Sequence, residues 1–309
     1  MSAKKYLIVI AGPTASGKTG LGIQLAQHYK TVILSADSRQ FYREMSIGTA
    51  KPDAQELAAA PHYFVNSHSI QAPYSVGDYE KEALELLEIL FQERDLVLLV
   101  GGSGLFIRAL CEGLDEFPTV DPDIRAALNR ELTEFGIEPL QKELARVDPE
   151  YYQEVDRANP KRLIRALEVY RASGQAYSSF RKGQKQVRPF QSIYLALSVE
   201  RDRLYQRINQ RVDEMMKAGL LEEARQLYPL RTLNALQTVG YQELFDYFDQ
   251  KHNLETAIEL IKRNSRRYAK RQMTWLRKEA HWSYFDPQNM KAIIQHINQQ
   301  IQQNNDLET

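Results

Sequence analysis

The stretch "GPTASGKT", residues 12–19, constrains the fold of this chain more than any other. A glycine, four residues, and then Gly17, Lys18 and Thr19 form the P-loop pattern, in which backbone N–H groups and a helix N-terminus converge on a phosphate. The pattern follows the apolar run "YLIVIA" (6–11) and precedes "KTGLGIQLAQHY", which has a helical pattern. A strand, a glycine-rich turn and a helix in this order are the context that the motif requires, so we predict that a phosphorylated ligand binds here.

Two side chains of the motif have expected roles at a phosphate. Lys18 is expected to reach the outer phosphate, and the Thr19 hydroxyl to coordinate Mg²⁺. Kinases, GTPases and ATPases share the motif, so it names no reaction by itself. The sequence has no "NKxD" guanine motif, which argues against a GTPase, and Asp95 lies at the wrong end of the apolar run 96–100 to serve as a Walker-B carboxylate.

Short apolar runs typical of buried parallel strands recur along the chain. They are residues 6–11, 31–36, 96–100, 193–198 and 282–285. Helical patterns alternate with the first of these runs, and one of them spans residues 76–93. Strand–helix alternation that begins with a P-loop predicts an α/β fold, a doubly wound parallel sheet with its site at the carboxyl ends of the strands.

The alternation stops at residue 114 and resumes after residue 188, and the intervening pattern is helical. Two segments there carry helix start and stop signals. The signals are Asp121, Pro122 and Gly136 in the first segment, and Asn159, Pro160 and Gly174 in the second. We therefore predict a P-loop α/β catalytic core formed by residues 1–113 and 189–309, with a helical insertion domain at 114–188. The stretch "QQIQQNNDLE", residues 299–308, is expected to be a polar tail.

The composition indicates a globular protein of a reducing compartment. The chain has 309 residues, and 40 acidic residues balance 40 basic ones, so the net charge indicates no partner. The single cysteine, Cys111, excludes an intramolecular disulfide and is expected in the core. No segment approaches the roughly 18 consecutive apolar residues of a membrane helix. We expect a soluble, cytoplasmic protein without membrane association.

The charges are unevenly distributed along the chain. Residues 112–156 carry thirteen acidic and four basic residues, whereas 157–188 carry nine basic residues and Glu168 alone. Residues 261–280 carry eight basic residues and Glu279 alone. Such segregation is typical of solvated helix faces or of a surface that meets a polyanion, and its repetition favours nucleic acid.

The basic segments have a usable geometry on their expected helices. Lys161, Arg162 and Arg165 share one helix face, which suits phosphates rather than bases. In the second segment Tyr268 and Trp275 are interleaved with arginines and lysines, as platforms for stacked bases would be. Packing in the core is the alternative for both aromatic residues, and for Trp275 we favour it.

Polar residues follow the ends of the expected strands. Asp37 comes directly after the second strand, where a carboxylate can hold Mg²⁺, accept a proton or cap the next turn. Gly101 and Gly102 end the third strand before Ser103, and two glycines allow backbone to approach a ligand closely. Arg211 lies on the helix after the fourth strand, where it either reaches a diphosphate or remains exposed.

Seven stretches fall in an order that resembles the tRNA dimethylallyltransferases, also called tRNA isopentenyltransferases. They are "GPTASGKT" (12–19), "SADSRQFYREMSIGTAKP" (35–52), "APHY" (60–63), "LLVGGSGLF" (98–106), "NPKRLIRALEV" (159–169), "TVGYQE" (238–243) and "AKRQMTWLR" (269–277). The similarity extends from residue 6 to residue 282. Two positions depart from the family pattern, since Ser103 replaces a usual threonine and Gln242 replaces a frequent basic residue.

The resemblance implies a reaction. The dimethylallyl group of dimethylallyl diphosphate would move to N6 of the adenosine on the 3′ side of the anticodon, in tRNAs that read codons beginning with U, with release of diphosphate. Asp37 matches the family's general base, and Lys18, Thr19 and Arg211 would stabilise the leaving diphosphate, with Mg²⁺ on Thr19. The residues expected around the donor diphosphate are Gly12, Pro13, Thr14, Ala15, Ser16, Gly17, Lys18 and Thr19.

The resemblance also implies contacts with tRNA, on a monomeric enzyme. The implied residues are Asp37, Ser38, Arg39, Gln40, Ser103, Arg125, Lys161, Arg162, Leu163, Ile164, Arg165, Val239, Gly240, Tyr241, Gln242, Lys270, Arg271 and Gln272. The basic faces of both segments coincide with parts of this set. Two alternatives remain: a small-molecule or nucleotide kinase with the same core fold, and a tRNA-binding protein whose P-loop is inactive.

Overall fold

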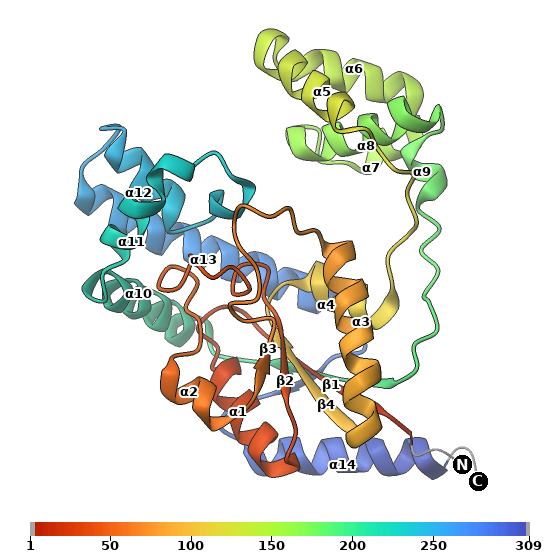
Figure 1. Ribbon diagram of the computed structural model, residues 1–309, viewed down its shortest axis with the longest axis vertical. Coiled ribbons are helices and arrows are strands. Elements are labelled where there is room, and N and C mark those ends of the chain that lie inside the picture. Colours follow the sequence, from red (N-terminus) through yellow and green to blue (C-terminus); the bar gives the residue numbers. More distant parts are fainter. Residues whose placement is uncertain (1–3, 307–309) are drawn as a thin grey trace. The chain divides into compact units, whose positions relative to one another are not determined.

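The computed structural model describes residues 4–306 and contains a six-stranded sheet with the order β3-β2-β4-β1-β5-β6 (Figure 1). The strands are β1 (Tyr6–Ala11), β2 (Ile33–Ala36), β3 (His62–Tyr63), β4 (Leu96–Gly101), β5 (Gln191–Leu197) and β6 (Ser283–Phe285). All five pairings are parallel, so the carboxyl ends of the strands meet at one edge. The predicted parallel α/β sheet is confirmed.

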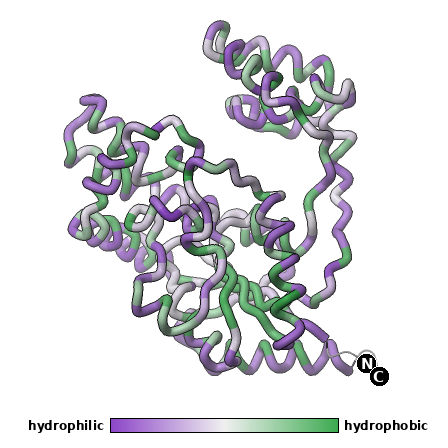
Figure 2. The backbone as a smooth tube through the Cα atoms, in the orientation of Figure 1, coloured by the Kyte–Doolittle hydropathy of each residue, from purple (hydrophilic) through white to green (hydrophobic). Residues whose placement is uncertain are grey.

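The strand that leads into the P-loop lies in the middle of the sheet, between β4 and β5. All six of its residues are buried, and they alternate between two cores. Leu7 and Val9 pack in a core with α3 and α4, whereas Ile8 and Ile10 pack in a core with α1 and α14. Figure 2 shows these strands as a hydrophobic centre of the chain. Burial on both faces fixes β1 and therefore the loop that follows it.

Helices pack around this sheet, and those of the C-terminal part form a further helical layer. They are α1 (Lys18–Tyr29), α2 (Ala54–Ala59), α3 (Val76–Glu93), α4 (Gly104–Glu112), α10 (Arg201–Lys217), α11 (Leu220–Leu227), α12 (Tyr241–Phe248), α13 (Leu254–Lys278) and α14 (Met290–Asp306), with the 3-10 turns η1 (Tyr228–Leu230) and η2 (Asn234–Leu236). A further core joins α10–α13 to Phe41, Tyr42 and Met45. The segment after β2 therefore packs on the C-terminal helices.

A second compact unit, Gly113–Gln186, is inserted between α4 and β5. Its helices are α5 (Pro122–Phe135), α6 (Glu138–Val147), α7 (Pro149–Glu154), α8 (Pro160–Ser173) and α9 (Tyr177–Phe180). It has a core of its own, in which Leu128, Leu140 and Leu167 are fully buried. Its ends differ from the predicted 114–188 by one residue at the start and two at the end. The predicted limits of α5 and α8 agree with the structure, although the Asn159 side chain makes no capping bond.

Two sequence-based expectations about the core were incomplete or wrong. The two-residue strand β3 was not predicted, because two residues carry too little pattern to recognise. The polar tail expected at 299–308 is instead, as far as Asp306, the end of α14, which buries Ile293 and Ile297 against the sheet, and residues 307–308 lie outside the described residues. None of the helices within residues 4–306 is both long and apolar enough to cross a membrane.

Candidate active site

A cavity of about 420 Å³ lies in the α/β unit, where β2 and β4 end beside the P-loop. It brings together predicted site residues that are far apart in the sequence. These are Thr14, Lys18, Thr19, Asp37, Ser38, Arg39, Gln40, Arg211, Val239, Gly240, Gln242, Arg271 and Gln272. Thr238 of the "TVGYQE" stretch lines it as well. The sequence had not indicated the polar side chains of Gln237 and Ser265, which also line the cavity. They lie in a loop and on a helix face without any local pattern.

The P-loop has the backbone of an anion cradle. Gly17 begins α1 with φ +93°, and Ala15 has φ +63°, a conformation that residues other than glycine rarely adopt. The Ser16 hydroxyl is buried and finds no hydrogen-bond partner within residues 4–306. Lys18 donates from Nζ to the carbonyl oxygen of Pro13 at 2.7 Å. An unpaired buried hydroxyl beside a lysine suits a ligand rich in acceptor oxygens.

Asp37 and Lys18 both line the cavity, and each affects the pKa of the other. Burial raises the pKa of the Asp37 carboxyl above its ordinary value, although the N–H of Arg39 and the charge of Lys18 oppose the shift. Burial also lowers the pKa of the Lys18 ammonium to about 8. The negative charge of Asp37 raises this pKa, and the positive charge of Arg211 lowers it further. A carboxylate with a raised pKa is a stronger base, and shifts of this kind are typical of functional sites.

Backbone bonds fix the segment that carries Asp37. Its Oδ1 accepts a hydrogen bond from the N–H of Arg39 at 2.9 Å. The N–H of Ser38 donates to Oγ of Ser103 at 2.9 Å, and the N–H of Ser103 donates to the Ala36 carbonyl at 3.2 Å. Ser103 itself is absent from the cavity wall. Its hydroxyl therefore supports Ser38, a bond that the family's usual threonine can also make.

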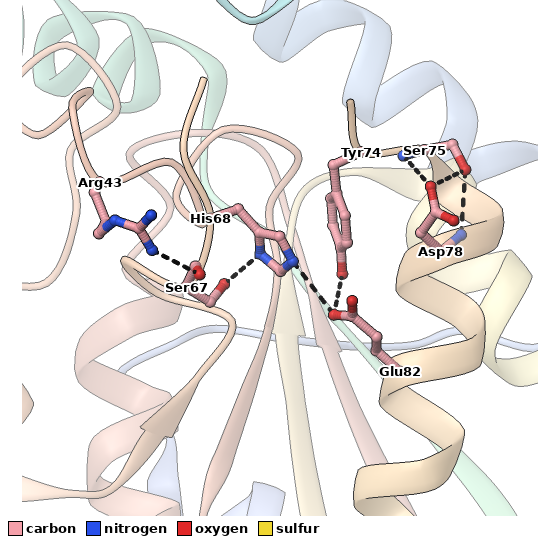
Figure 3. Close-up of polar contacts among 7 residues, drawn as sticks. All are labelled: Arg43, Ser67, His68, Tyr74, Ser75, Asp78 and Glu82. Carbon is pink, nitrogen blue, oxygen red and sulfur yellow. Dashed lines mark hydrogen bonds and ion pairs between the residues drawn. The ribbon is translucent and has the colours of Figure 1, made fainter. Parts of the chain in front are cut away.

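The outer side of the same segment is held by the loop before α3 (Figure 3). His68 exchanges backbone hydrogen bonds with Phe41 and Arg43, both at 2.8 Å. Its ring bridges Ser67 Oγ at 2.8 Å and the carboxylate of Glu82 on α3 at 3.4 Å. These contacts connect residues 41–43 to a helix packed on the sheet, so the segment after Asp37 is supported from both sides.

Gln272 lies in the cavity wall but is buried, and both polar atoms of its side chain already form hydrogen bonds within the protein. Its Oε1 accepts from the N–H of Thr14 in the P-loop at 2.9 Å, and its Nε2 donates to the carbonyl of Gly102 at 2.9 Å. A base contact by Gln272, as the resemblance implies, would break one of these bonds. Gly101 lines the cavity, as the paired glycines led us to expect, and both glycines also allow close packing within the protein, Gly101 against the Ala36 backbone and Gly102 against Gln272.

The residues around the start of α12 fall into two groups, those that line the cavity and those that are buried in the core. Val239, Gly240 and Gln242 line the cavity. Tyr241 is fully buried and donates from its hydroxyl to Glu223, so its side chain is not available to tRNA. The Gln242 side chain donates to Gln237 at 2.8 Å, which gives this departure from the family pattern a partner within the protein.

The long helix α13 contributes both aromatic and basic residues. Tyr268 lines the cavity, and burial together with the charge of Asp37 raises its pKa to about 12, so it stays a neutral hydrogen-bond donor. Trp275 packs against Trp282 in the core beside Gly104, as favoured from the sequence. Lys270 is exposed outside the cavity, whereas Arg271 lines it.

In the helical unit the apolar residues predicted to contact tRNA are buried, whereas the basic ones are partly exposed. Leu163 and Ile164 belong to the core of the unit, so their side chains are not available to tRNA and only their backbone could contact it. The buried carboxylate of Glu168 pairs with Arg125 at 2.5 Å and with Arg165 at 2.7 Å. Both guanidinium groups nevertheless remain about half exposed.

Acidic and basic side chains that are separated along the sequence of this unit form ion pairs with one another in its structure. Arg171 pairs with Glu131 and Glu143, and Arg181 pairs with Glu154. The acidic and basic segments thus neutralise each other, which sequence counts cannot reveal. Lys161 and Arg162 are exposed, and within residues 4–306 neither forms an ion pair. Lys161 and Arg162 are therefore available to a polyanion.

The described residues contain no group of three histidine, cysteine, aspartate or glutamate side chains that could hold a metal ion. Thr19 and Asp37 both line the cavity and offer single oxygen ligands. Mg²⁺ is typically held by one or two protein oxygens together with substrate phosphates and water. The residues present therefore fit a magnesium ion that arrives with a diphosphate.

The chain is similar to known proteins over most of its length. The family model "IPP transferase" matches residues 40–279. The tRNA dimethylallyltransferase of Christiangramia forsetii is 55% identical over 96% of this chain and 98% of its own length. This chain belongs to the IPP transferase family. Another member, the tRNA dimethylallyltransferase of Cytophaga hutchinsonii, is 48% identical over 97% of this chain and 98% of its own length.

Solved structures extend the likeness of this IPP transferase family member to the fold. The full-length tRNA isopentenylpyrophosphate transferase of Bacillus halodurans aligns with a TM-score of 0.74 and 35% identity over 99% of both chains. A eukaryotic dimethylallyltransferase, solved acting on tRNA, aligns with a TM-score of 0.75 and 27% identity over 93% of this chain and 75% of that one. The predicted family is confirmed, and a kinase is not favoured.

Proposed function

We propose that this protein transfers the dimethylallyl group of dimethylallyl diphosphate to N6 of the adenosine on the 3′ side of the anticodon, in tRNAs that read codons beginning with U. The observation that carries the proposal is one cavity lined by Lys18, Thr19 and Asp37, in which burial raises the pKa of the carboxyl. An anion cradle beside a strong base suits a reaction in which diphosphate leaves and an amine loses a proton. Membership of the family supports tRNA as the acceptor.

In the proposed reaction the C1–O bond of the donor breaks and a bond forms between adenine N6 and C1. Diphosphate leaves with the electron pair of the broken bond, and a proton of N6 passes to the Asp37 carboxylate. The adenine amine is a weak nucleophile because its lone pair is delocalised into the ring. A positioned base typically contributes about 10²–10⁴-fold to such a step. The adenine must first leave its stack, at a cost of a few kcal/mol.

The leaving diphosphate would be stabilised by the P-loop amides, Lys18 and Arg211. Arg211 lines the cavity from α10, so the two cations approach the diphosphate from different elements. Mg²⁺ on Thr19 would add positive charge where negative charge develops. The apolar side chains of Ile208, Val212, Met215 and Ile261 line the same cavity and suit the hydrocarbon part of the donor.

The tRNA would be held outside the cavity by exposed cations. Lys161 and Arg162 in the helical unit and Lys270 on α13 are exposed, and contacts from such residues to phosphates carry most of the affinity for nucleic acid. Arg39 and Arg271 line the cavity and would contact the flipped nucleotide or its neighbours. We further propose that the protein acts as a cytoplasmic monomer, as the resemblance to its family implies.

The test supplies purified protein with unmodified tRNA and either labelled dimethylallyl diphosphate or labelled ATP. We expect the dimethylallyl label on the tRNA together with free diphosphate, and no label from ATP. Phosphoryl transfer from ATP would support the kinase instead, and tRNA binding without turnover would support a protein with an inactive P-loop. Mapping the label by nuclease digestion identifies the modified base and distinguishes N6 prenylation from labelling elsewhere.

A further inference from the structure

The loop of residues 46–50 contributes to one wall of the cavity. Gly48, Thr49 and Ala50 line it. Gln40 connects this wall to the segment of the proposed base, since its Nε2 donates to the carbonyls of Thr49 at 3.3 Å and Ala50 at 3.2 Å. Its Oε1 accepts from Ser35 Oγ at the end of β2 at 3.2 Å. A displacement of the loop would therefore move Gln40, three residues from Asp37.

One carboxylate on α11 anchors this loop from outside the cavity. Oε2 of Glu223 accepts from the N–H groups of Ser46 at 3.0 Å and Ile47 at 2.8 Å. Oε1 accepts from the N–H of Gly48 at 2.9 Å and from the Tyr241 hydroxyl at 2.6 Å. Successive N–H groups that point to one spot form an anion-binding nest, and here the anion is a side chain of the protein.

The loop needs such an anchor because its conformation is unfavourable by itself. Ala50 has φ +49°, in a region that residues other than glycine rarely adopt and that surrounding contacts must maintain. Gly48 lies so close to the Tyr241 ring that a Cβ there would be 2.6 Å from ring atoms. The Tyr241 ring and the Glu223 carboxylate together define where residues 46–48 can lie.

We propose that Glu223 is a positioning residue of the active site, which fixes residues 46–50 and, through Gln40, the segment that carries Asp37. The proposal rests on the proposed function, in which Asp37 takes the proton. Glu223 does not line the cavity and does not contact the P-loop, so its loss should impair the acceptor side of the reaction and leave the binding of diphosphate unchanged.

The test compares Glu223→Gln with Glu222→Gln. Glutamine keeps the size of the side chain but replaces one acceptor oxygen by an NH₂ group, which breaks two of the four bonds. Glu222 is the matched control, because it precedes Glu223 on the same helix, is exposed and makes only a 3.5 Å ion pair with Arg225. The readouts are amide hydrogen exchange at residues 46–48, the Kd of inorganic diphosphate, and kcat and KM for tRNA.

For Glu223→Gln we expect faster exchange at 46–48, an unchanged Kd for diphosphate, an unchanged KM for tRNA, and a fall in kcat of about 10²-fold, the usual effect of a small misplacement at a reacting group. Glu222→Gln should match the wild type in all four. A merely structural role for Glu223 would lower the melting temperature and the active fraction while leaving the kcat of the folded enzyme unchanged.

Two results would overturn the proposal: unchanged exchange at 46–48 in Glu223→Gln, or faster exchange with unchanged kcat. If that variant does not fold, Gly48→Ala replaces it, because the added Cβ displaces the loop from Tyr241 without removing a charge, and the same fall in kcat with normal diphosphate binding is expected. If the wild-type protein transfers no dimethylallyl group, the proposed function fails, while the exchange data still decide whether Glu223 anchors the loop.

Discussion

Substitution of Gln272 by methionine tests whether this residue organises the donor site or recognises tRNA. The change keeps the length and flexibility of the side chain and removes both polar atoms. It leaves the N–H of Thr14 and the carbonyl of Gly102 without their partners, each of which lies at 2.9 Å in the structure. The P-loop would then lose its direct connection to the loop that follows β4.

The structure bounds the size of the effect. A buried group left unpaired costs about 1–3 kcal/mol. Thr14 lines the cavity and can be hydrated there, so we count only the buried carbonyl of Gly102 in full and expect about 1–3 kcal/mol in total. If this free energy is expressed in the ordering of the P-loop, the Kd of diphosphate rises about 5- to 150-fold, at 1.4 kcal/mol per factor of ten.

The assay is calorimetric titration of inorganic diphosphate with Mg²⁺, beside kcat/KM for a matched tRNA and for one with altered neighbours of the target adenosine. Thr274→Ala serves as the control, since Thr274 is exposed on the same helix and its hydroxyl bonds only the Lys270 carbonyl within α13. We expect weaker diphosphate binding and an unchanged ratio between the two tRNAs. A changed ratio with normal diphosphate binding would refute the reasoning and assign Gln272 to base recognition.

Three further predictions concern charges. Asp37→Asn should lower the single-turnover rate about 10²–10⁴-fold with tRNA affinity retained in filter binding, and a near wild-type rate would exclude Asp37 as the base. Because burial lowers the pKa of Lys18 to about 8, the Kd of diphosphate should rise as pH increases through that value, and a Kd independent of pH would contradict this. Because burial raises the pKa of Asp37, kcat/KM should fall on the acid side at a pH above the ordinary carboxyl range, and a kcat/KM that stays constant there would contradict this. Lys161→Ala should weaken tRNA binding and reduce the salt slope by about one without loss of stability, whereas Arg165→Ala should also lower the melting temperature, because Glu168 is left buried with one partner fewer.

The features that could be predicted from the sequence have strong local or topological signals. The limits of α3 and α5 follow from apolar periodicity and capping residues, and the P-loop at the end of β1 follows from its spacing. Asp37 could be placed near the P-loop because parallel strands end at one edge of the sheet. These signals depend on a few neighbouring residues or on a rule of topology, so one sequence suffices to detect them.

The features that were missed depend on partners far away in the chain. The role of Gln272 requires Thr14, 258 residues earlier, and that of Glu223 requires the N–H groups of residues 46–48. The charge counts favoured a polyanion-binding surface, but the pairing of Arg171 with two glutamates is visible only in the folded unit. The last turns of α14 were interpreted as a polar tail because almost all of their residues are glutamine, asparagine or aspartate.

The opposite charges in the cavity link the two halves of the proposed reaction. The positive charge of Lys18 lowers the pKa of Asp37 and so weakens it as a base. A bound diphosphate would compensate that charge, because it carries negative charge to the same ammonium. The pKa of Asp37 would then rise further, and the carboxylate would be a stronger base in the presence of the donor than in its absence. The proton acceptor would thus be strongest when a dimethylallyl group is there to be transferred, which favours the productive order of donor before deprotonation.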